Sequence, residues 1–215
     1  MALGCGGEAL SQTSSDGFAG AMRFYRAAAE RGDPQAQFLF GIQLESGVLG
    51  QVNDGQAVLW FRRAAEGGLA IAQFKLGTAY QQGRGLALDP IEARRWYRRA
   101  ADQNLAEAQY NLAYLLETGI GGPRETGEAA RLYEVAAGAG LPEAQFNLAA
   151  LILAGEGTAR DPVEAYKWLA LARRGGFDAA TELIAELGSE LNAEELAEAN
   201  RRAEDWVKNH RALRR

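Results

Sequence analysis

The chain has 215 residues, of which 47% are hydrophobic and 24% are charged, and this balance excludes an intrinsically disordered protein. Its formal net charge is −5, with acidic and basic residues interspersed, which argues against general nucleic-acid binding because that function needs a dominant basic field. No segment approaches the roughly 20 consecutive apolar residues of a membrane-spanning helix.

The residues that usually carry catalysis are scarce. Cys5 is the only cysteine and His210 the only histidine, so an internal disulfide and a cysteine metal site are excluded, and His210, at the end of the chain, is a poor catalytic candidate. Carboxylate pairs are abundant but fall on predicted solvated helix faces. We therefore expect no enzyme activity, no cofactor and no metal. No signal peptide is visible, which favours a cytoplasmic protein; a periplasmic or secreted location stays open if a leader has been removed.

The N-terminal segment precedes the regular part of the chain. Residues 1–14 are rich in Gly, Ser and Thr, which predicts a flexible lead-in. A helix is expected from Ser15 or Asp16 to Gly32, because a glycine often ends a helix. Its apolar positions match those of the later second helices, so it is interpreted as half of a repeat.

A six-residue motif then recurs four times at intervals of 36 residues, beginning at Ala36, Ala72, Ala108 and Ala144. A fixed period of this length indicates a solenoid of stacked supersecondary units. Each unit is predicted to contain two helices, and the first starts near the alanine. Its apolar stripe has i, i+4, i+8 spacing, and a small residue within the stripe lets the partner helix approach closely.

Glycines mark the predicted end of each first helix, at Gly47, Gly83, Gly119 and Gly155. In three copies another glycine follows two residues later. A phosphate-binding loop would follow a strand and open a helix, whereas these glycines follow a helix, so we interpret them as helix termination.

The second helices begin with capping sequences and carry large core side chains. Asp89-Pro90-Ile91-Glu92 and Asp161-Pro162-Val163-Glu164 predict capping boxes in which Glu bonds back to the cap amide. Asn53 is a variant cap, and the start at Glu125 is weaker. The tryptophans, Trp96 among them, alternate with alanines and are predicted to be core rather than ligand-stacking residues.

The pattern decays after Gly176. A further capping box at Asn192-Ala193-Glu194-Glu195 opens a longer, highly charged helix. A solenoid needs an end unit that hides its last apolar face, so residues 188–209 are predicted to be that cap. Asn209-His210-Arg211 and Arg214-Arg215 are expected to form a solvated basic tail.

The repeated pattern resembles the Sel-one-like repeat, a relative of the tetratricopeptide repeat. The second copy carries the resemblance best, through Ala72, Leu76, Gly77, Tyr80, Gly83, Gly85, Asp89, Ala93, Trp96, Tyr97, Ala100 and Ala101. The resemblance implies an all-α, right-handed α-solenoid of antiparallel helix pairs at residues 15–187, followed by a C-terminal capping helix and basic tail at 188–215. It also implies adaptor or scaffold work, often in bacteria, on a concave face.

Helical winding predicts which first-helix positions face away from the core. At about 100° per residue, these lie two, three, six and ten residues beyond each alanine. The candidate partner-binding residues on this face are Phe74, Lys75, Thr78, Tyr110, Asn111, Tyr114, Phe146 and Asn147. The row Lys75, Asn111, Asn147 is similar to tetratricopeptide positions that bind a peptide backbone or carboxylate.

The sequence leaves open both the placement of the aromatic side chains and the kind of partner. The aromatic file Phe38, Phe74, Tyr110, Phe146 either faces the groove or packs between neighbouring repeats. The favoured function is a scaffold that binds a peptide or partner protein in the concave groove. A carbohydrate-binding accessory of an exopolysaccharide or envelope system is the alternative, because rings with polar neighbours stack on sugars.

Overall fold

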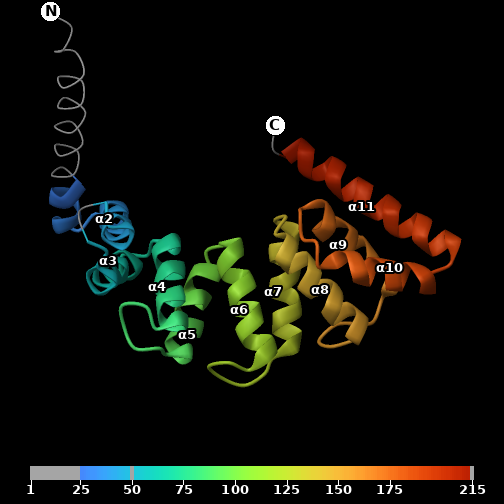
Figure 1. The fold of residues 1–215 in the computed structure, drawn as a ribbon, viewed down its shortest axis with the longest axis horizontal. Coiled ribbons are helices and arrows are strands. Elements are labelled where there is room, and N and C mark those ends of the chain that lie inside the picture. The colour runs from blue at the N-terminus through green and yellow to red at the C-terminus, as the bar shows by residue number, and fades with distance from the viewer. Residues whose placement is uncertain (1–24, 49–50, 214–215) are drawn as a thin grey trace, which may run out of the picture. The chain divides into compact units, whose positions relative to one another are not determined.

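The computed structural model describes residues 25–48 and 51–213, in which all regular structure is helical (Figure 1). Residues 25–30 are helical, whereas the predicted lead-in and the predicted helix start at Ser15 or Asp16 lie outside the described residues. The helices that follow are α2 (Pro34–Ser46), α3 (Asp54–Glu66), α4 (Ala70–Gln82), α5 (Pro90–Ala101), α6 (Ala106–Thr118), α7 (Thr126–Gly138), α8 (Pro142–Ala154), α9 (Pro162–Arg174), α10 (Ala180–Glu190) and α11 (Ala193–Leu213).

The chain divides into two compact units, residues 1–96 and 97–215, with the division inside α5. In the first unit α3 packs against α2 and α4. In the second unit α7 packs against α6 and α8, and α8 packs against α9. The all-α class and the consecutive helix pairs are therefore confirmed. None of the described helices combines the length and the hydrophobicity that a bilayer span requires.

Side-chain caps begin the helices where the sequence predicts them. Asp89 accepts from the amides of Ile91 and Glu92 at 3.0 and 3.1 Å, and Asp161 accepts from Glu164 N at 3.0 Å. The predicted return bond from Glu to the cap amide is wrong at both sites: the carboxylates of Glu92 and Glu164 bind Arg95 and Lys167 instead. A basic residue one turn later competes for each of them.

The capping of two other helices, α11 and α7, also agrees with the prediction from the sequence. At α11 the reciprocal box is complete, because Asn192 caps Glu194 and Glu195 while Glu195 accepts from the Asn192 amide at 2.9 Å. At α7 the cap residue Glu125 makes no side-chain cap bond, as its weaker sequence predicts.

The glycines at the ends of the first helices have two separate tasks. Gly47, Gly83, Gly119 and Gly155 adopt positive φ between 68° and 74°, which confirms helix termination. The second glycine of the pair lets loops approach closely. A Cβ added at Gly157 would collide with the Thr126 carbonyl at the start of α7, and one at Gly85 would collide with that of Asp54 at the start of α3.

A buried glutamine joins each first helix to the end of the helix before it. The Nε2 atoms of Gln37, Gln73, Gln109 and Gln145 donate to the carbonyls of Ala29, Ala65, Ala101 and Ala137 at 3.1, 3.1, 3.4 and 3.1 Å. These carbonyls lie in the last turn of a helix, where backbone acceptors lack partners within the helix. The glutamines therefore hold the repeat in register, a role that their polar character concealed in the sequence.

Two of the three tryptophans of the second helices, Trp96 and Trp168, are core residues as predicted, whereas Trp60 on α3 is half-buried beside Phe40. Trp96 packs with Val58 and Leu76 in the core of the first unit. In the second unit Trp168 is buried beside Leu169. Each unit thus has its own apolar core.

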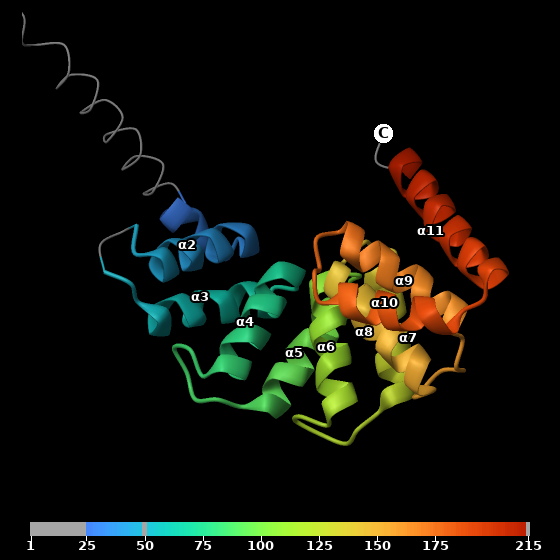
Figure 2. The ribbon, with the colours of Figure 1, turned by 45° about the vertical axis from the view of Figure 1, so that its right-hand side comes forward.

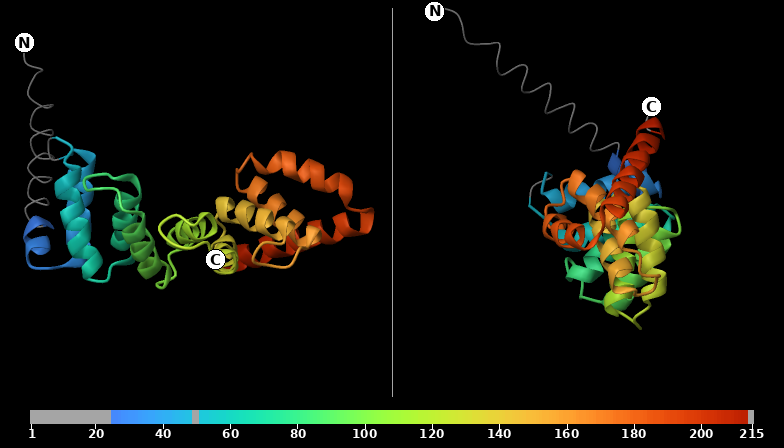
Figure 3. Two further views of the ribbon diagram at one scale, coloured as in Figure 1. Left: turned by 90° about the horizontal axis from the view of Figure 1, so that it is seen from below. Right: turned by 90° about the vertical axis from the view of Figure 1, so that its right-hand side faces the viewer.

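The C-terminal helix closes one end of the second unit. α9 packs against both α10 and α11, and α11 runs back along the unit from the end of α10 (Figures 2 and 3). Trp206 of α11 lies edge-on to Trp168, with ring centroids 6.3 Å apart. Leu171 on α9 is 4% exposed, whereas Val135, at the equivalent position of α7, is 52% exposed. This burial is the expected effect of an end cap.

The predicted solvated tail is wrong at His210. Its ring is half-buried and stacks on Trp206 at 3.6 Å between centroids, and its Nε2 donates to the Gly138 carbonyl at the end of α7. The cause is the short connection between α10 and α11, which consists of Leu191 and Asn192 alone. Earlier first and second helices are joined by residues 83–89, 119–125 and 155–161.

Candidate partner-binding faces

The eight predicted partner-binding residues divide between the two units. Three lie on α4 of the first unit: Phe74, Lys75 and Thr78. Five lie on α6 and α8 of the second unit: Tyr110, Asn111, Tyr114, Phe146 and Asn147. Each group is built by its own unit, so we describe the two groups in turn.

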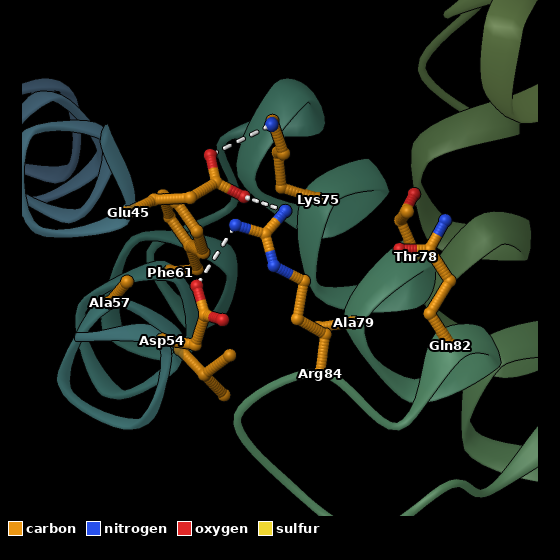
Figure 4. A pocket seen from close by; sticks show the side chains of 10 residues that line it. Glu45, Asp54, Ala57, Phe61, Lys75, Thr78, Ala79, Gln82 and Arg84 are labelled. Carbon is orange, nitrogen blue, oxygen red and sulfur yellow. Dashed lines mark hydrogen bonds and ion pairs between the residues drawn. The ribbon is translucent and has the colours of Figure 1, made fainter. Parts of the chain in front are cut away.

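In the first unit Lys75 belongs to a closed set of ion pairs. Its Nζ lies 3.0 Å from Glu45 Oε2, and Arg84 lies 3.2 Å from the other oxygen of Glu45 and 2.9 Å from Asp54 (Figure 4). The hydrogen bond with Asp54, and then the charges of Asp54 and Glu45, raise the pKa of Arg84. The four side chains, two cationic and two anionic, line a cleft of about 190 Å³.

This arrangement changes the predicted role of Lys75. The prediction treats it as a free charge for a ligand, but Glu45 already neutralises the ammonium group, and the Lys75 side chain is 33% exposed. The set of ion pairs joins α2, the start of α3 and α4. A ligand carboxylate would have to displace Glu45 to reach Lys75.

Phe74 and Thr78 are half-buried on the same helix. The Thr78 hydroxyl donates to the Phe74 carbonyl at 3.1 Å, a local bond within α4. Thr78 lines the same cleft as Glu45, Lys75, Arg84 and Asp54 and supplies no charge to it.

In the second unit a chain of hydrogen bonds connects three helices. Asn147 on α8 donates through Nδ2 to the Tyr133 hydroxyl at 3.1 Å, and that hydroxyl donates to Glu117 Oε2 on α6 at 2.8 Å. Tyr133 comes from α7 and is fully buried. Burial, followed by the hydrogen bond to Glu117, raises its pKa, so the phenol stays protonated and keeps donating.

The aromatic file packs between helices rather than facing outward as open rings. Tyr110 lies 5.8 Å from Tyr133, and Phe146 lies 5.0 Å from Phe177 in the connection between α9 and α10. Phe38 of the first unit makes a similar contact with Phe61 at 5.7 Å. At Phe38, Tyr110 and Phe146 each contact joins two rings of the same repeat, so the packing lies within a repeat and not between neighbouring repeats, the alternative that the sequence left open.

Two side chains of the predicted set remain available to a partner. Tyr114 is 40% exposed. Asn111, one turn earlier on α6, is half-buried and makes no side-chain hydrogen bond with residues 25–48 or 51–213. An amide in this state can both donate and accept, as recognition of a peptide group requires.

The winding argument missed Glu45 and Glu117, which occupy one repeat position, nine residues beyond the alanine. At 100° per residue this position lies beside the one two residues beyond the alanine, which the prediction included. Among the described residues, no group of three or more His, Cys, Asp or Glu side chains is arranged to hold a metal ion.

Comparison with known proteins identifies the repeat. Five consecutive segments match the Sel1 repeat, at residues 16–33, 34–69, 70–105, 106–141 and 142–177. The chain belongs to the Sel1 repeat family. Sel1 repeat proteins are in general protein-interaction scaffolds and non-enzymatic.

Solved structures of Sel1 repeat proteins support the same fold. A protective antigen of uropathogenic Escherichia coli that displays this fold is similar with a TM-score of 0.77 and 29% identity over 86% of the chain; the match spans 41% of the antigen. A Sel1 repeat protein from Oxalobacter formigenes is similar with a TM-score of 0.72 and 29% identity, over 92% of this chain and 84% of that one. No curated protein sequence matches the chain.

Proposed function

We propose that this Sel1 repeat protein is an interaction scaffold that binds an extended peptide segment of a partner protein on the α6–α8 face. We define this face by Tyr110, Asn111, Tyr114 and Glu117 of α6 with Glu143, Phe146 and Asn147 of α8. The observation that carries the proposal is the half-buried amide of Asn111, which has no partner among the described residues and lies one turn from the exposed ring of Tyr114.

The chemistry of a peptide suits these groups. Nδ2 of Asn147 is held by the Tyr133 hydroxyl, so its Oδ1 is the atom left to accept a peptide N–H. Asn111 supplies both a donor and an acceptor. A polar face of this kind pairs with main-chain groups, while the ring of Tyr114 contributes apolar contact area.

The face of α4 is a weaker second contact in this proposal. Phe74, Lys75 and Thr78 stay assigned to it, but the charge of Lys75 is neutralised by Glu45. Substitutions there should therefore weaken partner binding less than substitutions on the α6–α8 face.

Carbohydrate binding has less support. Sugar stacking needs an open ring face, and the rings of Tyr110 and Phe146 are half-buried against other rings. The contacts favour a protein partner over a glycan.

A peptide display experiment tests the proposal. Peptides selected on the purified full chain from a random library should bind at least about tenfold more weakly to Asn111→Leu and to Tyr114→Ala, a loss of about 1.4 kcal/mol each. Val135→Ala serves as the matched control, because Val135 is exposed on α7 of the same unit. Selected peptides that bind both α6 variants as tightly as the unchanged chain would contradict the proposal.

A further inference from the structure

The helices of the second unit differ in the sign of their charge. The first helices α6 and α8, together with α10, contain acidic residues and no Lys or Arg: these are Glu107, Glu117, Glu143, Glu182, Glu186 and Glu190. The basic residues lie on the other helices and in the connections, with Arg131 on α7, Lys167, Arg173 and Arg174 on α9, and Arg124 and Arg160 between helices. The α6–α8 face is thus negatively charged within a unit of mixed composition.

Pairing separates the two sets of carboxylates further. On α7, α9 and α11 five of the eight carboxylates form ion pairs within the unit: Glu128 binds Arg98, Glu164 binds Lys167, and Glu204 binds Arg174, for example. The other three, Glu134, Glu194 and Glu195, form none with the described residues. By contrast, Glu107, Glu117 and Glu143 make no ion pair with any residue that the structure describes.

The cation nearest in sequence to Glu117 is already engaged. Arg124, in the loop after α6, donates through Nε to the Glu117 backbone carbonyl at 2.8 Å, and its guanidinium pairs with Glu156. On α10 the situation differs, because Arg160 lines a small cleft with Glu186 and Glu190. On α6 and α8, by comparison, every carboxylate lacks an ion pair within the described part of the chain, and neither helix carries a Lys or Arg.

The structure holds Glu117 in a defined place. Its Oε2 accepts from the buried Tyr133 hydroxyl, which fixes the carboxylate while it remains half-exposed. Tyr114 lies three residues earlier on the same helix, so its exposed ring is a neighbour of Glu117 on the helix surface. Burial, and then the charge of Glu143, raise the pKa of nearby Tyr110, in agreement with a local negative potential.

We propose that the segment bound on the α6–α8 face carries a lysine or arginine side chain, which pairs with Glu117 and lies against the ring of Tyr114. This inference rests on the proposed function and adds the chemical class of the partner, a basic peptide segment. A carboxylate next to an aromatic ring suits such a cation, because it offers both an ion pair and a cation–π contact. The partner's charge also complements the unpaired Glu107 and Glu143, which speeds association.

The test uses the full chain and the peptides selected by display. Each selected peptide is synthesised in two forms, as selected and with every Lys and Arg replaced by Gln, and the dissociation constants are measured by fluorescence polarisation. We expect the Gln form to bind about tenfold to a hundredfold more weakly, the range for loss of a hydrogen bond to a charged group. Higher salt should weaken binding of the basic form alone.

Variants of the chain show which carboxylates contribute to binding of the basic peptide. Glu117→Gln keeps an acceptor for Tyr133 while removing the charge, and should weaken the basic peptide about tenfold. Glu143→Gln removes a second negative charge at an exposed position. It leaves the hydrogen bonds of Tyr133 unchanged, so its effect on peptide binding reports the charge alone. Glu134→Gln on α7 makes the same change in net charge outside this face and should leave binding unaltered.

The outcomes separate this inference from the proposed function. Selected peptides without Lys or Arg, or binding that falls with Asn111→Leu but not with either Glu→Gln change, would overturn the inference and leave peptide binding standing. Insensitivity to all of these variants would overturn both. Self-association of the chain that disappears with Glu117→Gln would show a second copy as the occupant, which also overturns the inference.

Discussion

The two units use the same pair of repeat positions in different ways. In the first unit Glu45, nine residues beyond the alanine of its repeat, reaches Lys75, three residues beyond the alanine of the next. In the second unit the equivalent residues are Glu117 and Asn147, and the Tyr133 hydroxyl lies between them. One backbone arrangement thus produces a closed ion pair in one place and a carboxylate without a countercharge in the other.

The difference shows that the pairing of this carboxylate depends on two side chains from neighbouring first helices. Lysine at the second position satisfies the carboxylate internally. Asparagine cannot do so, because its amide is neutral, and the carboxylate keeps its charge without an ion pair. The following predictions test this comparison, beginning with the scaffold on which it depends.

The largest effect is expected from Trp96→Ala. Trp96 lies in the core of the first unit, and its removal should lower the free energy of unfolding by about 3–5 kcal/mol. Denaturant unfolding followed by circular dichroism measures the change. A midpoint equal to that of the unchanged chain would mean that this core does not hold the helices in register.

Tyr133→Phe tests the hydrogen-bonded chain of the second unit. The substitution keeps the ring and removes the hydroxyl that binds both Asn147 and Glu117, so it should cost about 1–2 kcal/mol of stability. The ring contact with Tyr110 supplies an internal control, because it persists in the variant. Unchanged stability would show that the hydroxyl contributes nothing to this unit.

Asn147→Lys is designed to convert the second arrangement into the first. The new ammonium group should pair with Glu117, as Lys75 pairs with Glu45, and should weaken binding of a basic peptide about tenfold. Fluorescence polarisation measures the affinity. Asn147→Leu is the uncharged control, and an equal loss with both variants would argue against a role for charge.

Glu45→Gln should have the smallest effect. The ion pairs of Lys75 and Arg84 are partly exposed, so their loss should cost roughly 1 kcal/mol or less and should matter less at high salt. Thermal melting at low and high ionic strength measures both features. A salt-independent loss would point to packing rather than charge.

Much of the fold follows from the sequence because it depends on local rules repeated four times. The alanine-centred motif, the positive-φ glycines and the caps at Asp89 and Asp161 each act within a few residues. Repetition makes such signals easy to read. The helix pairs and the burial of Trp96 and Trp168 could therefore be predicted.

The site was less predictable because it is made by residues far apart in the chain. Glu45 and Lys75 are 30 residues apart, and Glu117 meets Asn147 only through Tyr133 of the intervening helix. The docking of His210 likewise depends on a short connection that redirects α11. Helical winding places a side chain on a face, but it does not identify its neighbour across the next repeat.

The hydrogen bonds from the buried glutamines to the alanine carbonyls bear on how such a chain can change in length. Gln109 and Gln145 are bonded to alanines at equivalent places, Ala101 and Ala137. If residues 106–141 were excised, Gln145 would follow Ala101 at the distance in sequence that now separates it from Ala137. The same hydrogen bond is thus available to whichever repeat comes next, so removal of a whole repeat would leave the buried glutamine amide with an equivalent acceptor.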